Sequence, residues 1–444
     1  MKKNYLFVLT VILLANVGLG KDRRIDNRTE SARNLSPAIS RALQSVAGDR
    51  PVADRVVKDV VLANQMPGEF ERQGALLVAS KDLIGRTSDL FVEIVRSLRG
   101  KVEIVVLVSN VEEYEAAKGL LGANSVPLNN VHFVEVVHDT MWARDYGPII
   151  CRTKEGSPIV IDSRYDLTRV NDDQVPTMLA RLLGLRVVQM PLRLDGGNLL
   201  SNGQGLGITT RRLLHENAIG ELEEAWMHSV LQESFGFNRV VVLEPLVGEP
   251  TGHVDMFATF TSANTVVVGR YDPSTDAENA AILDRNAIKL AGLPTVAGPL
   301  RVVRIPMPPH DDAIWRTYAN VIYANGVLLV PTYGDVDQAG RREALATYAS
   351  LLPRWNIVSI DARSIIELNG ALHCLMMNLG PLGVLPEFPL PRTRTPVEEQ
   401  MDSGDDDDSI LLIDNMPYEA VRTSRRPFRK EVSRPGVRNR CLAP

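Results

Sequence analysis

Cysteine is scarce in this chain of 444 residues, which contains only Cys151, Cys374 and Cys441. Three cysteines do not supply the even-numbered disulfide framework typical of small exported domains, and their spacing matches no zinc-binding pattern. A chain of this length can bury a large core without disulfides, so its thiols are free for other chemistry.

An excess of positive charge is also lacking. The 49 Lys and Arg residues are outnumbered by 54 Asp and Glu residues, which gives a formal net charge of -5. Since domains that bind nucleic acid are usually strongly basic, we predict no nucleic-acid partner.

No long apolar run is found at the start of the chain, where a short one occupies residues 5–15. This run is too short for an ordinary membrane span. It follows two lysines and precedes the small residues Gly18 and Gly20, as in a secretory signal peptide. We therefore expect a signal peptide over residues 1–20, export to the periplasm or the exterior, and no membrane span after cleavage. An uncleaved N-terminal anchor is the alternative.

Composition divides the rest of the chain into three parts. Residues 21–61 form a polar, arginine-rich leading segment, and residues 62–388 have the texture of a folded domain. Residues 389–444 carry an acidic run, 405–408, followed by a basic stretch. Such blocks of charge with little hydrophobicity predict a disordered tail.

Runs rich in Val and Ile predict strands in the central part, with helical patterns between them. The strands are expected at 75–79, 102–108, 131–136, 187–190, 240–244, 302–305 and 357–360, and the helices at 82–98, 175–183, 213–235, 276–290 and 341–352. The last five strands begin about 53 to 62 residues apart, and each follows a helix. A repeat of this size is typical of a propeller, although a doubly wound sheet would also alternate strands and helices.

The segment from Trp142 to Pro148 places Asp145 beside an aromatic residue and closes on Gly-Pro. Aromatic faces attract guanidinium groups, and a carboxylate can accept two of their N–H bonds. The segment therefore suits a bound cation, or else forms a turn with an internal contact between Arg144 and Asp145.

Two further segments carry acidic residues and a histidine. Asp195 precedes two glycines in a tight turn, which is either structural or places a carboxylate to orient a histidine. Residues 251–256 are expected to begin a strand that continues to Phe260, so His253 and Asp255 would project from one face. They suit an acid–base residue beside a charge-binding carboxylate, or a buried histidine with its hydrogen bonds satisfied.

Cys374 follows His373 in the apolar stretch 368–377. On a strand these two side chains would point to opposite faces, so His253 is the better candidate base for the thiol. Taken alone, a cysteine here is a small buried hydrophobe. Together with the histidine and carboxylates, it predicts a cysteine nucleophile in a site with anionic walls. Such walls favour a cationic substrate over a peptide bond, whose hydrolysis needs an oxyanion to be stabilised.

These segments resemble, in order, the motifs of the agmatine deiminase and bacterial (porphyromonad-type) peptidylarginine deiminase family, within the guanidine-modifying enzymes. The resemblance covers about residues 62–385. The motifs are Met66 to Glu71, Trp142 to Pro148, Asp195 to Asn198, Gly252 to Asp255, Tyr318 to Asn320, Val330 to Asp335, and His373 with Cys374.

The resemblance implies an α/β fold, a five-bladed α/β propeller of the pentein type with pseudo-fivefold ββαβ repeats and a site at its axis. It implies that Cys374 is the nucleophile and that His253 is the general acid and base. It further implies that Asp145 and Asp255 bind the guanidinium nitrogens.

The same resemblance assigns Trp142 to packing on the substrate, Asn320 to a position near the nucleophile, and Asp195 to the orientation of His253. It implies no cofactor and no metal. The expected reaction is hydrolysis of a guanidinium group to a ureido product and ammonia, through a thiouronium intermediate on Cys374.

The chain departs from the family in two places. First, residues 369–372 stand where the family commonly has a Gly-rich segment. Second, the loop 165–173 resembles a loop that carries two substrate-binding arginines in the secreted peptidylarginine enzymes. Arg169 matches one of these arginines, but Leu167 stands at the position of the other. The substrate therefore stays open between agmatine and arginine in a peptide. A non-catalytic protein that binds a cationic ligand and an amidinotransferase are the alternatives, and no oligomeric state is predicted.

Overall fold

The computed structural model describes residues 63–220, 223–380 and 382–391. The expected signal peptide, the leading segment, Cys441 and nearly all of the expected tail lie outside these residues. Contacts divide the chain into units 1–393 and 394–444, and every described residue belongs to the first.

Five β-sheets of three or four strands, plus a two-stranded ribbon, form the strand framework of the described residues. In each of the five, the first strand pairs antiparallel with the second, which pairs parallel with the third. The sheets are β5 (Ile149–Thr153), β6 (Pro158–Arg164) and β7 (Arg186–Arg193); β8 (Leu200–Ser201), β9 (Leu206–Thr210) and β10 (Arg239–Leu243); β11 (Ala258–Ser262), β12 (Thr265–Arg270) and β15 (Arg301–Pro306); β16 (Ile322–Ala324), β17 (Val327–Thr332) and β18 (Asn356–Asp361); and β19 (Met376–Asn378), β2 (Ala75–Ala79), β3 (Glu103–Val108) and β4 (Val131–Glu135). The ribbon is β13 (Pro294–Thr295) with β14 (Gly298–Pro299), and β1 (Ala63–Gln65) adds to β5.

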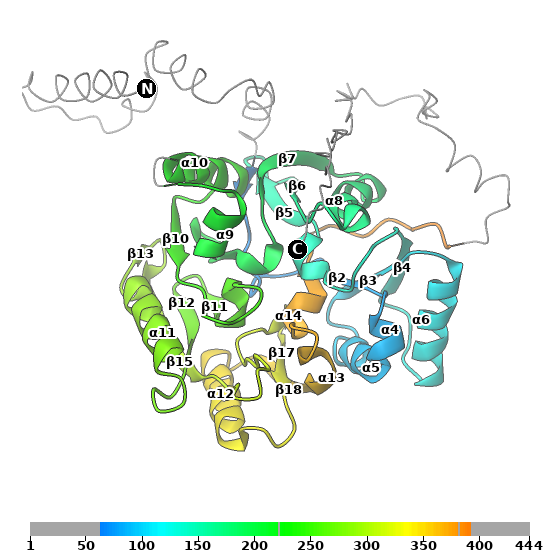
Figure 1. Ribbon diagram of the computed structural model, residues 1–444. Helices are drawn as coiled ribbons and strands as arrows, with labels where there is room; N and C mark the ends of the chain where they lie inside the picture. Colours follow the sequence, from blue (N-terminus) through cyan, green and yellow to red (C-terminus); the bar gives the residue numbers. More distant parts are fainter. Residues whose placement is uncertain (1–62, 221–222, 381, 392–444) are drawn as a thin grey trace, which may run out of the picture. The chain divides into compact units, whose positions relative to one another are not determined.

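Helices make the connections between parallel strands, which cannot be joined by a tight turn. They are α4 (Leu83–Arg86) and α5 (Ser88–Ser97), α6 (Val111–Ala123), α8 (Val170–Leu182), α9 (Arg211–Glu216) and α10 (Glu224–Phe235), α11 (Ala277–Leu290), and α12 (Gln338–Leu351). In Figure 1 the sheets follow one another around a centre that holds α14 (Leu372–Leu375), while α6, α10, α11 and α12 lie at the periphery. Among the described residues, no helix is long and apolar enough to cross a membrane.

The seven strands predicted from Val- and Ile-rich runs are confirmed as β2, β3, β4, β7, β10, β15 and β18. The five that recur at a similar interval are the last strands of the five sheets. The regular interval between these strands therefore reflects a structural unit that repeats along the chain. Because the described strands form separate small sheets, the doubly wound alternative is wrong.

Two helix predictions fail in detail. The segment 82–98 forms two helices that meet at Thr87, and the segment 213–235 contains α9 and α10. After α9, Asn217 hydrogen-bonds the backbone of Arg193, and Ala218 has a φ of 50°. These contacts turn the chain away from the helix axis and end α9.

The strand predicted from Thr251 begins only at Ala258, because residues Val254–Met256 form the 3₁₀ turn η2. Similarly, Cys374 lies in the helical turn α14, and the strand β19 starts at Met376. Both predictions of strand geometry at the candidate site are therefore wrong.

The repeat gathers the sequence motifs in one place. A short segment precedes the first strand of each sheet: α7 (Ala143–Tyr146) before β5, η1 (Gly196–Asn198) before β8, η2 before β11, residues 317–320 before β16, and α14 before β19. Helix α14 contacts α7, α7 contacts η1, and η1 contacts η2. Each sheet thus contributes one segment to a common site.

Candidate active site

Cys374 lies in α14, where its turn is held by the buried side chain of Asn320. Asn320 Oδ1 accepts hydrogen bonds from the backbone N–H of His373 at 2.8 Å and of Cys374 at 3.4 Å. Asn320 Nδ2 lies 3.5 Å from Cys374 Sγ, and Asp255 Oδ2 lies 3.9 Å from the same sulfur. The thiol is thus fixed beside one amide and one carboxylate.

The surroundings of Cys374 keep its thiol protonated. Burial, followed by the negative charges of Asp255 and Asp145, raises its pKa well above the usual value. A thiolate is the reactive form of cysteine, so the nucleophile becomes active only when a cation offsets these carboxylates.

His253 lies at the start of η2, and the turn before it is fixed by several hydrogen bonds. Gly252 has a φ of 67°, donates its N–H to Glu249 Oε2 at 2.6 Å, and accepts from Thr210 Oγ1 at 2.7 Å. A left-handed φ favours glycine, so this position suits Gly252 and directs the next residue into the site.

Two carboxylates flank the imidazole of His253. Its Nε2 lies 3.1 Å from Asp195 Oδ2, and its Nδ1 lies 3.6 Å from Asp145 Oδ1. Burial disfavours the charged ring, but the attraction of Asp145 and Asp195 outweighs it and raises the pKa of His253 to about 10. His253 is therefore an imidazolium at neutral pH and has a proton to donate.

Gly197, in η1, marks the point on which the polar groups converge. A Cβ atom at Gly197 would lie 2.8 Å from Asp145 Oδ1, 2.9 Å from His253 Nδ1 and 3.0 Å from Asp255 Oδ2. Those distances are shorter than normal carbon contacts, so only glycine leaves these three groups undisturbed.

The site is rich in unsatisfied acceptors. Within the described part of the chain, the buried Oδ1 atoms of Asp145, Asp195 and Asp255 have no hydrogen-bond partner. Burial, partly offset by His253, raises the pKa of Asp145 to about 7. Buried polar atoms are normally hydrogen-bonded, so three carboxylate oxygens without a hydrogen bond in one place indicate a binding site for a ligand with several N–H donors.

Trp142 precedes Asp145 by one helical turn and packs against the segment before α14. A Cβ at Gly370 would overlap the indole ring of Trp142. Trp142 is half-buried, so part of the residue remains accessible.

Arg169, immediately before α8, is linked to the site through aromatic residues. Its Nη1 donates to Tyr165 Oη at 2.9 Å, and the Tyr165 ring packs edge-on against Tyr146, with the ring centres 5.8 Å apart. Burial, followed by the charges of Asp145 and Asp195, raises the pKa of Tyr165. Tyr165 therefore separates Arg169 from the carboxylates of the site. Leu167, in the same loop, is 85% exposed.

The structure thus brings together six of the predicted residues, Asp145, Asp195, His253, Asp255, Asn320 and Cys374, with Trp142 beside them. It also reveals a largely buried, hydrogen-bonded set that we did not predict, Glu69, Arg144 and His373, which contacts Asp255 through His373. Glu69 lies in the Met66 to Glu71 motif and His373 precedes Cys374, so the motifs contained the signal. Because we expected a strand at Cys374, we placed the His373 side chain on the opposite face, away from the site.

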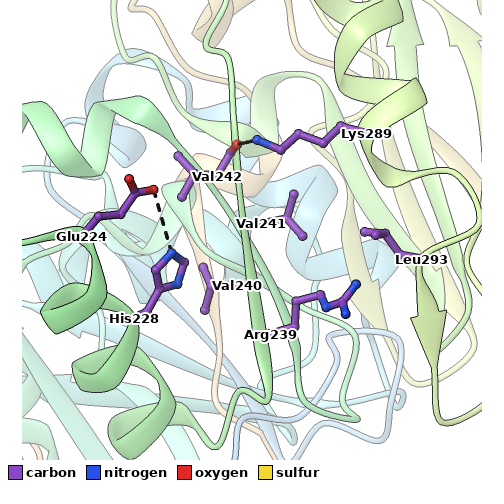
Figure 2. Close-up of a pocket in the computed structure, with 8 residues that line it drawn as sticks. All are labelled: Glu224, His228, Arg239, Val240, Val241, Val242, Lys289 and Leu293. Carbon is purple, nitrogen blue, oxygen red and sulfur yellow. Dashed lines mark hydrogen bonds and ion pairs between the residues drawn. The ribbon is translucent and has the colours of Figure 1, made fainter. Parts of the chain in front are cut away.

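Two surface hollows are lined by none of these residues. One, of about 300 Å³, lies along β10 between α10 and α11 (Figure 2), where Lys289 Nζ donates to the carbonyl of Val242 at 2.7 Å. The other, of about 770 Å³, lies beside α5 and β18. Among the described residues, no cluster of three or more His, Cys, Asp or Glu is arranged to hold a metal ion.

A buried cysteine, an imidazolium and three carboxylates, presented together with the Asn320 amide by five repeated α/β units, define a cysteine-dependent hydrolase site for a cationic substrate. The chain belongs to the Porphyromonas-type peptidyl-arginine deiminase family, whose sequence model matches residues 65–379.

Three relatives illustrate this membership. A Mycoplasma mycoides subsp. mycoides protein named "Putative agmatine deiminase" is 26% identical over 322 residues, which cover 64% of this chain and 85% of that protein. A Porphyromonas gingivalis structure described as a "Putative Arginine Deiminase" is 27% identical, with a TM-score of 0.61 over 70% of this chain and 97% of that one. An agmatine deiminase of Enterococcus faecalis, 20% identical with a TM-score of 0.62 over 70% of this chain and 94% of that one, shares the fold.

Proposed function

We propose that this protein is a deiminase that hydrolyses a guanidinium group to a ureido group and ammonia, with Cys374 as nucleophile. The observation that carries the proposal is the convergence of Asp145, His253 and Asp255 on Gly197, with the Cys374 thiol 3.9 Å from Asp255. Family membership supports the same reaction.

Substrate binding follows from the free acceptors. A guanidinium group is planar and carries N–H donors on every nitrogen, and carboxylates bind it through paired hydrogen bonds. The oxygens of Asp145 and Asp255 that lack a hydrogen bond accept these bonds, while the half-buried Trp142 packs on the substrate.

Binding activates the thiol. The positive charge of the substrate offsets Asp255 and Asp145, which otherwise raise the pKa of Cys374. The thiol then releases its proton to solvent water, since His253 is already protonated, and the thiolate forms a bond to the guanidinium carbon. Asn320 Nδ2, 3.5 Å from the sulfur, stabilises the thiolate.

His253 serves as the acid and then as the base. It donates a proton to the departing nitrogen, the C–N bond breaks, and ammonia leaves a thiouronium bonded to Cys374. The neutral imidazole next takes a proton from water, whose oxygen bonds to the same carbon, and the C–S bond breaks to release the ureido product. Asp195, 3.1 Å from Nε2, holds the ring in place.

The propeller architecture and the export of the protein are part of the same proposal. Five sheets with one strand pattern are consistent with a five-bladed propeller of the pentein type, with the site at its axis. The short apolar run at residues 5–15 supports export of the protein.

The substrate is agmatine or arginine in a peptide. Arg169 supports a peptide substrate, because its guanidinium group, which is hydrogen-bonded to Tyr165, can hold a carboxylate at the far end of the substrate. Ammonia release from agmatine, free arginine and peptides ending in arginine, with and without a Cys374→Ala substitution, tests the proposal. We expect release from one of them, abolished by the substitution. Binding without release would indicate a non-catalytic protein, and transfer of the amidine to an added amine would indicate an amidinotransferase.

A further inference from the structure

We propose that His373 is a positioning residue for this reaction: as an imidazolium held between Glu69 and Asp255, it fixes the Asp255 carboxylate so that one oxygen is left for the substrate. The inference rests on the proposed function, in which Asp255 binds the guanidinium group.

The charge of His373 follows from its two hydrogen bonds. Its Nδ1 lies 2.7 Å from Asp255 Oδ2, and its Nε2 lies 2.8 Å and 3.0 Å from the two oxygens of Glu69. An ionised carboxylate only accepts hydrogen bonds, so both ring nitrogens have to donate. A ring that donates from both nitrogens is cationic.

The wider surroundings favour the same charge. Arg144 Nη1 donates to Glu69 Oε1 at 2.7 Å, and its Nε donates to the backbone carbonyl of His373 at 3.3 Å. Burial opposes ionisation of Glu69, but Arg144 and His373 outweigh it and lower the pKa of Glu69 to about 2. Burial and Arg144 disfavour the imidazolium, but Glu69 and Asp255 outweigh them and raise the pKa of His373.

Two groups of the site face Asp255: the His253 imidazolium from η2 and the Asp145 carboxyl group from α7. The two other titratable groups beside the cluster are neutral. Cys374 follows His373 in α14, and Tyr323 of β16 lies near Glu69. Burial raises the pKa of both. The positive charge on His373 therefore depends on Glu69 and Asp255.

The consequence for Asp255 is an unequal pair of oxygens. Oδ2 accepts from His373 Nδ1 and, at 3.0 Å, from Asn320 Nδ2. Oδ1 is buried and has no partner among the described residues. Rotating the carboxylate would break both bonds to Oδ2, so His373 and Asn320 together set the direction of the free oxygen.

The charge state can be measured directly in the wild-type protein. In ¹⁵N-histidine NMR spectra, with the resonance assigned by a His373→Gln variant, both ring nitrogens of His373 are expected to be protonated at pH 8, above the ordinary histidine pKa of about 6.5. A ring that is neutral at pH 8 would overturn the proposal. This result does not depend on any activity, so it separates this inference from the proposed function.

A substitution of Glu69 tests the effect on the reaction. Glu69→Gln removes the charge that keeps His373 cationic while leaving a similar shape. Glu71→Gln is the matched control, because Glu71 belongs to the same motif and, within the described part of the chain, its side chain hydrogen-bonds only the backbone N–H of Gly68. We expect the kcat/KM of Glu69→Gln to fall by about tenfold relative to the wild type as the pH rises from 6 to 9, since a charged hydrogen bond becomes a neutral one.

Glu71→Gln should follow the wild type throughout. A merely structural ion pair would lower the kcat/KM of Glu69→Gln by the same factor at every pH, and that result would contradict the proposal. Should Glu69→Gln fail to fold, the NMR measurement on the wild type still decides.

Discussion

Asp255 Oδ2 lies 3.9 Å from Cys374 Sγ, so this carboxylate places its negative charge beside the thiol. After burial, this carboxylate is the largest cause of the raised pKa of the thiol. Replacing Asp255 with Asn should therefore lower the pKa of Cys374 and speed its alkylation by iodoacetamide at pH 8 by about tenfold, which corresponds to one pKa unit. The same variant should lose turnover, because the guanidinium group loses a ligand.

Asp162→Asn is the control for that prediction, because Asp162 is also a buried carboxylate but lies in β6, where it accepts hydrogen bonds from Thr177 of α8 and Gln189 of β7. It should leave the alkylation rate of Cys374 unchanged. Slower or unchanged alkylation in Asp255→Asn would show that Asp255 does not suppress the thiolate.

The crowding around Gly197 gives a second prediction. Gly197→Ala should lower kcat/KM by about a hundredfold or more, because the new methyl group displaces Asp145, His253 and Asp255. In contrast, Gly119→Ala, in the middle of α6 with no atom near the added Cβ, should keep full activity and gain up to about 1 kcal/mol of stability. Full activity in a folded Gly197→Ala protein would place the reacting groups elsewhere.

Asp195 is expected to act on kcat through His253. Asp195→Asn keeps the size of the side chain but removes the charge 3.1 Å from Nε2, so we expect kcat to fall by about tenfold to a hundredfold with KM little changed. Asp276→Asn is the matched control, since Asp276 pairs with His310 at 2.8 Å outside the site. Equal losses in the two variants would indicate a general effect on stability.

The raised pKa of Asp145, about 7, predicts the acid side of the pH profile. Below that pH the carboxyl group is neutral and loses its attraction for a guanidinium cation, so kcat/KM should fall by about tenfold per pH unit. A pKa raised by folding means that protonation of Asp145 stabilises the folded state, so the titration of Asp145 does not itself drive acid unfolding. Asp145→Asn should remove this limb at a lower overall kcat/KM, and a limb that persists in the variant would assign it to another group.

The sequence was most informative where local preference and tertiary structure agree. Runs such as residues 102–108 predict strands correctly, because β-branched side chains suit a sheet that is buried on both faces. The period of those strands likewise reports the repeat, because each sheet ends with one of them.

Prediction failed where tertiary contacts determine the backbone conformation. The apolar stretch around Cys374 is too short for its pattern to distinguish a strand from a helical turn. Its turn is held by Asn320, which lies 54 residues away in the chain and bonds two backbone N–H groups. The partners of His373 could not be predicted for the same reason, since Glu69 and Asp255 reach it from distant segments.

The most direct test is mass spectrometry of enzyme quenched in acid during turnover. The account predicts an adduct on Cys374 whose mass equals that of the substrate less one ammonia, because ammonia leaves before the rest of the substrate is released. Continued turnover with no adduct on Cys374, or an adduct on the buried Cys151 instead, would contradict the account. An adduct that carries only the amidine carbon and its nitrogens would assign the protein to amidine transfer.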